Sequence, residues 1–257
     1  MSHLVSTEKP LTLETTIQER RLAGVSRLYG PEAFEVFERS HVVVVGLGGV
    51  GSWAAEALAR SAIGELTLID FDHIALSNTN RQLHALEGSF GKSKVKAMSE
   101  RLHAINPLLK IHEIDDFLTP DNIEQLLSPK MAILDATDAL ASKVALAVWA
   151  KHHGAILVMS GAAGGKVDPT KIKIEDLART TQDPLLSRIR AKLRKEFGFE
   201  KDPKKRMRVR AVFSEEPRSG VAQGGLACSG YGSGVTVTAS FGFIAAAEIL
   251  AQLKNRS

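Results

Sequence analysis

The segment 41–51 constrains the fold of this chain more than any other. Four consecutive valines, Val42 to Val45, are typical of a strand buried on both faces, as in the interior of a parallel sheet. Glycines follow at four positions, which are Gly46, Gly48, Gly49 and Gly51. Residues 52–60 then favour a helix. A strand, a glycine turn and a helix in this order predict a phosphate-binding loop, because the turn lets backbone amides approach an anion at the helix N-terminus.

Apolar runs and helical patterns alternate along the rest of the chain. Strands are predicted at 66–70, 109–114, 131–135, 155–159 and 209–213, with an exposed strand at 172–174. Helices are predicted at 13–28, 32–39, 92–106, 138–153 and 238–253, with a short helix starting at Thr119 and a basic helix after the exposed strand. This alternation predicts an α/β fold with a doubly wound, mostly parallel sheet and right-handed crossovers.

We expect a single domain over residues 1–257. Its predicted parts are N-terminal helices (1–40), a nucleotide-binding core (41–160) and a basic, irregular C-terminal extension on the substrate side (161–257).

Composition argues against several classes of protein. The single cysteine, Cys228, excludes an intrachain disulfide framework and a Cys-x-x-Cys metal site. The first twenty residues contain three glutamates and no apolar run, so a secretory signal is not expected. The apolar stretch 235–250 is short for a bilayer and contains Glu248, which predicts a buried helix. We therefore expect a cytoplasmic protein without a membrane partner. The eight histidines show no metal-ligand spacing.

Positive charge is concentrated in residues 188–210. This segment holds eleven Lys and Arg residues against three Asp and Glu residues, so its net charge is +8 and that of the rest of the chain is −4. Such concentration favours a polyanionic partner such as nucleic acid. A solvated helix face is the simpler interpretation of the same charges.

A polar segment follows the second predicted strand. Asp70 closes that strand about twenty residues after the glycine turn, where a carboxylate can accept hydrogen bonds from ribose hydroxyls. Its alternative role is that of a turn residue or helix cap. Residues 71–91 show little periodicity, and connections of this length in compact domains are often functional.

Five motifs follow one another along the chain. They are Gly-x-Gly-Gly-x-Gly at 46–51, Asp-x-Asp at 70–72, Asn-x-Asn-Arg-Gln at 78–82, Gly-x-x-Lys-Val at 91–95 and Asp-x-x-Asp at 135–138. In this combination the sequence resembles the ubiquitin-activating-enzyme-like adenylating superfamily, which includes activators of sulfur-carrier proteins. The stretches 27–30, 51–60, 182–185 and 238–243 make it similar to the tRNA threonylcarbamoyladenosine dehydratase family. That family uses ATP to cyclise the threonylcarbamoyl group on the adenosine beside the anticodon, and it lacks the cysteine-bound zinc of its relatives.

The resemblance implies a Rossmann-like adenylating fold that uses ATP and Mg²⁺. In such a fold, Arg81 and Lys94 supply positive charge to the phosphates, and Asp138 holds Mg²⁺. The nucleotide-binding residues that it implies are Gly46, Gly48, Gly49, Gly51, Asp70, Asp72, Asn80 and Gln82.

The resemblance also implies partners. In a homodimer, Arg21 on the N-terminal helix reaches the phosphates of the other subunit, with Arg20 as the neighbouring candidate. The substrate that the resemblance implies is tRNA, for which the charge of the basic stretch 188–210 makes that stretch the candidate binding surface, and a cysteine desulfurase or sulfur-acceptor system is a further candidate partner.

Structural roles compete with several of these assignments. Lys94 has the alternative of an exposed helix lysine, and Asp135 or Asp138 that of a helix cap. Asn78 and Asn80 are also common turn formers. Cys228 is either a reactive thiol in a mobile crossover or an inert buried one.

The alternative function is adenylation of a ubiquitin-like sulfur-carrier protein. A nicotinamide-dependent dehydrogenase would share the glycine turn, but neither Tyr29 nor Tyr231 is followed by a lysine four residues later. A non-catalytic nucleotide-binding module would not need Arg81, Lys94 and Asp138 together.

Overall fold

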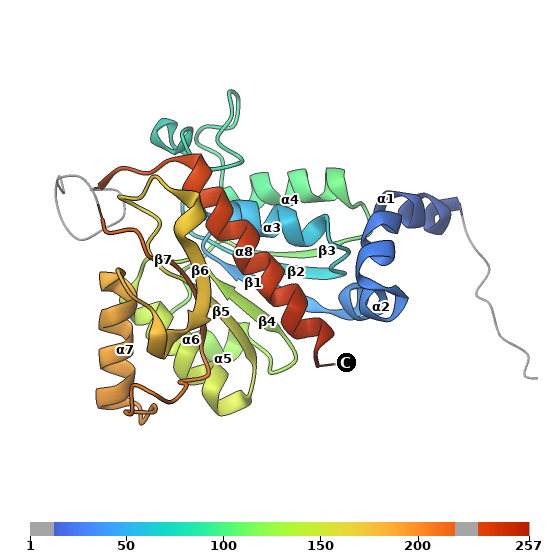
Figure 1. The fold of residues 1–257 in the computed structure, drawn as a ribbon. Coiled ribbons are helices and arrows are strands. Elements are labelled where there is room, and N and C mark those ends of the chain that lie inside the picture. The colour runs from blue at the N-terminus through green and yellow to red at the C-terminus, as the bar shows by residue number, and fades with distance from the viewer. Residues whose placement is uncertain (1–12, 219–230, 257) are drawn as a thin grey trace, which may run out of the picture.

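The computed structural model describes residues 13–218 and 231–256. Within them, seven strands form one sheet in the order β3-β2-β1-β4-β5-β7-β6 (Figure 1). The strands are β1 (His41–Val45), β2 (Glu65–Ile69), β3 (Lys110–Ile114), β4 (Ala132–Asp135), β5 (Ile156–Ser160), β6 (Ile172–Asp176) and β7 (Arg210–Ser214). β6 runs antiparallel to β7, whereas the other neighbouring strands are parallel. The predicted doubly wound, mostly parallel α/β fold is confirmed.

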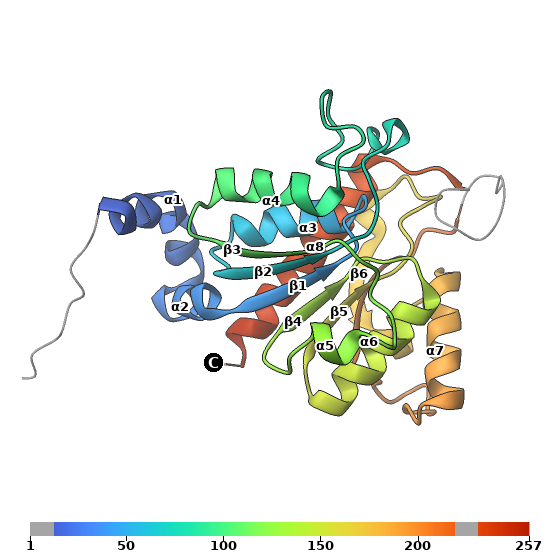
Figure 2. The ribbon, with the colours of Figure 1, turned by 180° about the vertical axis from the view of Figure 1, so that it is seen from behind.

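Helices cover both faces of the sheet. One face carries α3 (Gly51–Ala59), α4 (Lys94–Ile105) and α8 (Val235–Lys254) (Figure 1). The opposite face carries α5 (Ile123–Leu126), α6 (Leu140–His153) and α7 (Pro184–Glu196) (Figure 2). The helices α1 (Leu13–Tyr29) and α2 (Pro31–Arg39) precede β1 and lie beside the sheet (Figure 1).

The valines of β1 show how the two faces are built. Side chains alternate between the faces of a strand. Val42 and Val44 therefore pack in the core beneath α3 and α8, and Val43 and Val45 pack in the core beneath α6 and α7. Each of the four is at most 2% exposed, which confirms the prediction of a strand buried on both faces.

Several predicted boundaries differ from the structure. Asp70 follows β2 instead of ending it, and Asp138 lies in the loop between β4 and α6 instead of in the helix. Helix α4 begins at Lys94 rather than at residue 92, because Ser93 forms an isolated antiparallel bridge with His73. These shifts put both aspartates in loops at the carboxyl edge of the sheet.

Residues beyond 160 extend the same sheet. They add β7 and the edge strand β6, in which Ile172 is buried although the alternating pattern predicts an exposed strand. Helix α8 is long and apolar enough to cross a membrane by length and composition. Half of its most apolar segment is buried inside the fold, where the helix packs on the sheet, in agreement with the predicted buried helix. Cys228 lies outside the described residues.

A close helix–helix approach fixes α8 against α3. A Cβ atom at Gly242 in α8 would lie 2.5 Å from the carbonyl oxygen of Val50 and 3.0 Å from the amide nitrogen of Ala54. Trp53 on α3 and Phe243 on α8 pack edge to face beside this contact, with ring centroids 5.9 Å apart. Only glycine fits the approach without a shift of backbone.

We expect Gly242→Ala to lower the free energy of unfolding by about 1–3 kcal/mol, because the added methyl group must push α3 and α8 apart. Urea denaturation followed by circular dichroism measures this change. The matched control is Gly24→Ala in α1, where a Cβ would have no atom within 4 Å, and where alanine favours the helix by about 1 kcal/mol. Equal stabilities for the two variants would contradict the packing argument.

Candidate active site

The cleft of interest lies where the strand order reverses. From β1 the chain continues to β2 and β3 on one side, and then to β4 and β5 on the other. Open α/β sheets bind ligands outside the carboxyl ends of their strands at such a point. A cleft of about 530 Å³ occupies this position. Its walls come from the loops that follow β1, β2, β3, β4 and β5, together with the start of α8.

The glycine loop after β1 forms one wall of the cleft. Gly46 has a positive φ of 86°, and a Cβ there would lie 3.0 Å from the carbonyl oxygen of Ala136. A Cβ at Gly51 would collide with the carbonyl oxygen of Gly46. Gly48 lines the cleft, and a Cβ there would meet no atom within 4 Å. Gly46 and Gly51 thus close a tight turn, while Gly48 leaves the backbone accessible from the cleft.

Asp70 ties the glycine loop to the neighbouring strand. Its Oδ2 accepts a hydrogen bond from the Leu47 amide at 2.5 Å, and its Oδ1 accepts one from the Asp72 amide at 2.9 Å. The carboxylate lines the cleft and retains further lone pairs for a ligand hydroxyl. The turn role and the predicted ribose role of Asp70 are therefore compatible.

Lys94 lies at the cleft between two carboxylates. Its Nζ is 2.7 Å from Asp72 Oδ2 and 3.7 Å from Asp70 Oδ1, and the residue is only 4% exposed. This burial excludes the alternative interpretation of Lys94 as an exposed helix lysine. The two carboxylates neutralise the charge of the ammonium group.

Arg81 lies on a turn that packs against the glycine loop. Its Nη1 donates to the carbonyl oxygen of Ser77 at 2.9 Å and to Asn80 Oδ1 at 2.8 Å. The Trp53 indole donates to the Arg81 carbonyl at 2.9 Å, and a Cβ at Gly49 would lie 3.1 Å from Arg81 Cγ. Arg81 therefore lines the cleft on a turn that is fixed from both sides.

Several oxygen atoms at the cleft have no hydrogen-bond partner in the part of the chain that the structure describes. Among the described residues, the buried Gln82 Oε1 and Thr238 Oγ1 accept or donate no hydrogen bond. The Asp138 carboxylate is exposed and lines the same cleft, and it does not cap α6, which begins after Ala139 without a side-chain cap. Hard oxygen donors of this kind suit Mg²⁺ and ligand hydroxyl groups.

A buried ion pair between Lys143 and Asp135 lies next to the loop that carries Asp138. Lys143 on α6 is fully buried; its Nζ lies 3.0 Å from Asp135 Oδ2 and donates to the Ser160 carbonyl at 2.7 Å. Asp135 Oδ1 accepts from the amide and the hydroxyl of Thr137. Asp135 is thus a turn-forming residue that orders the loop carrying Asp138.

Two aromatic rings flank the mouth of the cleft. Phe71 and Phe117 are 50% and 57% exposed, and their ring centroids lie 4.7 Å apart. Sequence reasoning missed this pair, as it missed Thr238 and Lys143. The only available signal for the pair was the position of each phenylalanine just after a predicted strand.

The structure brings most of the predicted site residues together. The cleft is lined by Gly46, Gly48, Gly49, Asp70, Asp72, Arg81, Gln82, Lys94 and Asp138. Gly51 lies behind the loop as the first residue of α3, and Asn80 donates to the Ser233 carbonyl at 2.7 Å. Arg21 is exposed and donates to the Ile105 carbonyl at the end of α4, away from this cleft, and Arg20 is also exposed.

The basic stretch 188–210 divides into internal and exposed groups. Arg190 donates to the Leu177 and Thr180 carbonyls, Arg194 donates to the Glu200 carbonyl, and Arg210 pairs with Glu248 at 2.7 Å. The exposed basic residues are Arg188, Lys195, Lys201, Lys204, Lys205, Arg206 and Arg208. Not all of the local charge is therefore available to a polyanion.

His84 lies behind the cleft, close to Lys94. It is 3% exposed, and neither ring nitrogen has a hydrogen-bond partner among the described residues. Burial, with a smaller contribution from the positive charge of Lys94, lowers the pKa of His84 to about 4. The imidazole is therefore neutral at neutral pH.

The sequence of this chain is similar to those of several known proteins. The sequence matches the ThiF family over residues 19–256. It is 42% identical over 254 residues to the tRNA threonylcarbamoyladenosine dehydratase of Escherichia coli K12, which covers 93% of this chain and 95% of that protein. The Haemophilus influenzae protein of the same name is 41% identical over 247 residues, with the same coverage of both chains.

Solved structures show the same relationship. The Escherichia coli tRNA N6-threonylcarbamoyladenosine dehydratase in complex with ATP aligns with a TM-score of 0.87 at 41% identity, covering 95% of this chain and 98% of that one. Escherichia coli MccB with ATP aligns with a TM-score of 0.61 at 16% identity, which is a likeness of fold alone.

We expect the free energy of unfolding to fall as the pH drops from about 6.5 to about 4. Between these pH values the unfolded chain binds a proton at His84 and the folded chain does not. This difference lowers the free energy of unfolding by up to about 3 kcal/mol. His84→Leu should remove this contribution, leaving a flatter pH profile in urea denaturation. A profile for His84→Leu as steep as that of the wild type would contradict the argument.

Proposed function

The chain belongs to the ThiF family, and we propose that it is an ATP-dependent tRNA threonylcarbamoyladenosine dehydratase. The main support for this proposal is the extent of the similarity, because the Escherichia coli and Haemophilus influenzae dehydratases each match 93% of this chain. The Escherichia coli molybdopterin-synthase adenylyltransferase is 36% identical over only 42% of this chain. Sulfur-carrier adenylation is therefore the weaker candidate.

The proposed reaction activates a carboxylate. A carboxylate oxygen of the threonine moiety attacks the α-phosphorus of ATP, pyrophosphate leaves, and an acyl-adenylate forms. A nucleophile on the same modified base then attacks the acyl carbon, and AMP leaves with the carboxylate oxygen, so that the net change is loss of water. Proximity supplies a large effective molarity in this second, intramolecular step.

Arg81 and Lys94 are proposed to stabilise the negative charge that develops on the phosphate oxygens. Fixed positive groups aimed at developing charge lower the barrier most in a site that excludes water. Arg81 is fixed by hydrogen bonds to other residues of its own turn. Lys94 forms ion pairs with Asp70 and Asp72. An incoming triphosphate would compete with these carboxylates for the Lys94 ammonium group.

Mg²⁺ fits the oxygen donors at the cleft. Asp138 would hold the ion, since its carboxylate lines the cleft and caps no helix. Gln82 lines the same cleft, and its buried Oε1 has no hydrogen-bond partner among the described residues, so a turn of this side chain would offer a further oxygen to the ion's water or a ligand hydroxyl. When bound, the ion supplies charge neutralisation and Lewis acidity at the phosphates.

We further propose that the protein acts in the cytoplasm as a homodimer. The N-terminal helix α1 projects from the side of the sheet (Figure 1), and Leu28 at its end is 77% exposed. Arg21, which does not reach the cleft of its own chain, is proposed to contact phosphates bound by the other subunit, where a planar guanidinium suits a phosphate.

We expect Arg81→Ala and Asp138→Ala to lower the rate of ATP–pyrophosphate exchange by about 100-fold or more, because each removes a charge from the adenylation step. Exchange would be measured with substrate tRNA and radiolabelled pyrophosphate. Arg39→Ala, in the exposed residue at the end of α2, is the control. Undiminished exchange in the two cleft variants would refute the site assignment.

Nucleoside mass spectrometry separates the two candidate functions. Cells lacking the protein should accumulate uncyclised threonylcarbamoyladenosine in their tRNA, and the wild-type gene should restore the cyclic base. Unchanged tRNA nucleosides, with exchange that depends on a carrier protein's C-terminus, would favour sulfur-carrier adenylation instead.

We expect the exposed basic residues after α7 to contribute to tRNA affinity through phosphates. Replacing Lys204, Lys205 and Arg206 by alanine should weaken binding. It should also reduce the slope of log K against log salt concentration by about 1 for each phosphate that the variant no longer neutralises. Filter binding at several salt concentrations measures both quantities.

A charge-matched control removes three exposed basic residues that lie outside the basic stretch, namely Arg39, Lys110 and Lys130. This variant should keep the wild-type slope. Equal slopes for both triple variants would mean that residues 188–210 are a solvated surface and not a tRNA-binding one.

A further inference from the structure

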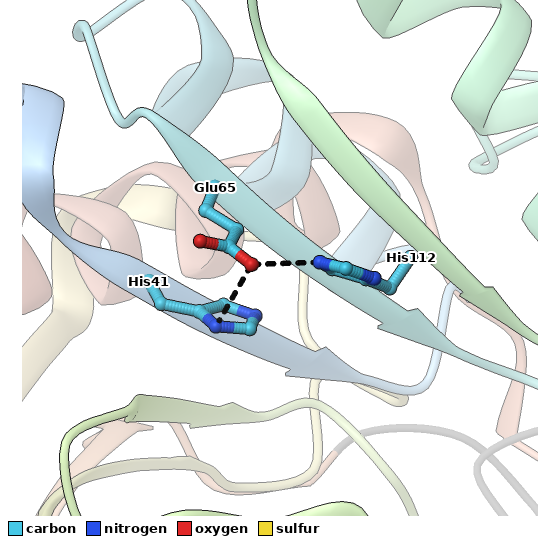
Figure 3. Close-up of side chains that lie close together, drawn as sticks. All are labelled: His41, Glu65 and His112. Atoms are coloured by element: carbon cyan, nitrogen blue, oxygen red, sulfur yellow. Dashed lines mark hydrogen bonds and ion pairs between the residues drawn. The ribbon is translucent and has the colours of Figure 1, made fainter.

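A cluster of two histidines and a glutamate lies at the edge of the sheet opposite the cleft. His41 begins β1, Glu65 begins β2, and His112 lies in β3 (Figure 3). The parallel register pairs His41 with Glu65 directly, and places His112 beside Thr67, two residues further along β2. β1 separates His41 from the glycine loop by about 13 Å at 3.3 Å per residue. The cluster is thus remote from the proposed chemistry.

The three side chains converge on one point. One ligand atom from each of His41, Glu65 and His112 lies within 4.8 Å of the other two. Glu65 Oε1 is 2.7 Å from His112 Nε2 and 3.5 Å from His41 Nδ1, and all three groups point toward one another in Figure 3. Ligand atoms at 2.0–2.1 Å from a tetrahedral Zn²⁺ lie about 3.3 Å apart. The Glu65–His41 separation already matches this spacing, the Glu65–His112 separation must open slightly, and the third pair lies within 4.8 Å.

A neighbouring hydroxyl group orients one ligand. His41 Nε2 lies 2.7 Å from Thr67 Oγ1, and Thr67 is 3% exposed. With the proton of His41 on Nε2 and donated to this hydroxyl, the lone pair of Nδ1 faces Glu65. A second hydrogen bond on the far ring nitrogen is how metal-ligating histidines are usually held in one tautomer.

The electrostatics favour the protonation states that bind a metal. Burial lowers the pKa of His41, opposed by the attraction of Glu65 and assisted by repulsion from His112. The hydrogen bond from His112 lowers the pKa of Glu65, and Lys110 acts in the same direction. His41 is therefore neutral and Glu65 ionised at neutral pH.

One side of the cluster is open to solvent. The side chains of His41, Glu65 and His112 are 17%, 33% and 54% exposed. No helix covers β2 and β3 on this face of the sheet in Figure 2. An ion can therefore enter, and a water molecule can complete four-coordination.

We propose that His41, Glu65 and His112 form a binding site for Zn²⁺ or another late first-row divalent cation. Two imidazoles and one carboxylate are a ligand set that suits Zn²⁺, Ni²⁺ and Cu²⁺ and disfavours Mg²⁺. The site joins the first strands of the sheet across three segments that are distant in sequence. It is independent of the ATP cleft and of the proposed function.

Titration of the metal-free protein with ZnCl₂, followed by calorimetry at neutral pH, tests the site. The expected result is one Zn²⁺ per chain and a higher melting temperature with the metal than without it. His112→Ala and Glu65→Gln should each weaken binding by at least about tenfold. Addition of Co²⁺ to the wild type should give the visible absorption of a four-coordinate ion, and both variants should lose it.

The control is His152→Ala, which removes an exposed histidine from α6 and should bind Zn²⁺ as the wild type does. Circular dichroism of each variant without metal shows whether the fold is retained, and Glu65→Gln keeps the shape of the side chain if His112→Ala disturbs β3. Wild-type affinity in both folded cluster variants, or saturation of the wild type only at millimolar Zn²⁺, would overturn the proposal and leave a hydrogen-bonded His–Glu–His cluster.

Discussion

The steric closeness of Gly46 and Gly51 is the constraint on which the cleft depends. Because no side chain fits between the end of β1 and the start of α3, the loop turns back tightly and Gly48 faces open space. The turn is fixed from below by the Asp70 carboxylate and from the side by Arg81. Helix α8 holds α3 in place through a second glycine contact at Gly242. The accessible backbone at the cleft is thus a consequence of contacts that hold the loop and α3 from three sides.

Lys94 and Arg81, two cations that line the cleft, are held by neighbouring residues. Lys94 is almost fully buried and would be costly to keep charged without Asp70 and Asp72 beside it. Arg81 is likewise engaged with a carbonyl and an amide oxygen. A triphosphate would replace these neutralising contacts instead of filling an uncompensated positive pocket. Such an arrangement stabilises the fold and still presents its cations at the carboxyl edge of the sheet.

The sequence predicted what depends on local pattern and missed what depends on register. Alternating apolar runs predicted the succession of strands and helices along the chain. Nine of the residues that the motifs pointed to line one cleft. Lys143 could not be predicted as a buried residue, since its partner Asp135 lies on another element. The His41–Glu65–His112 cluster could not be predicted from the spacing of its residues in the sequence, because it forms only where three parallel strands lie side by side. In the sequence, Arg190, Arg194 and Arg210 are part of the charge of the basic stretch. In the structure they bind carbonyl groups or Glu248 of the same chain.

The attachment of α7 links the basic surface to the cleft. Asp183 caps α7 by accepting a hydrogen bond from the Leu186 amide through Oδ1, and its Oδ2 accepts one from the Ala162 amide at 2.8 Å. The neighbours of Ala162, Gly161 and Ala163, line the cleft, as does Leu185 in the first turn of α7. A Cβ at Gly161 would collide with the Asp183 carboxylate, so the loop after β5 and the helix cannot separate without breaking this close approach. Of the exposed basic residues, Arg188 and Lys195 lie on α7, whose N-terminus is part of the cleft wall, and the others follow the end of that helix. A large polyanion can contact these basic residues and the cleft at the same time, whereas a small carboxylate cannot.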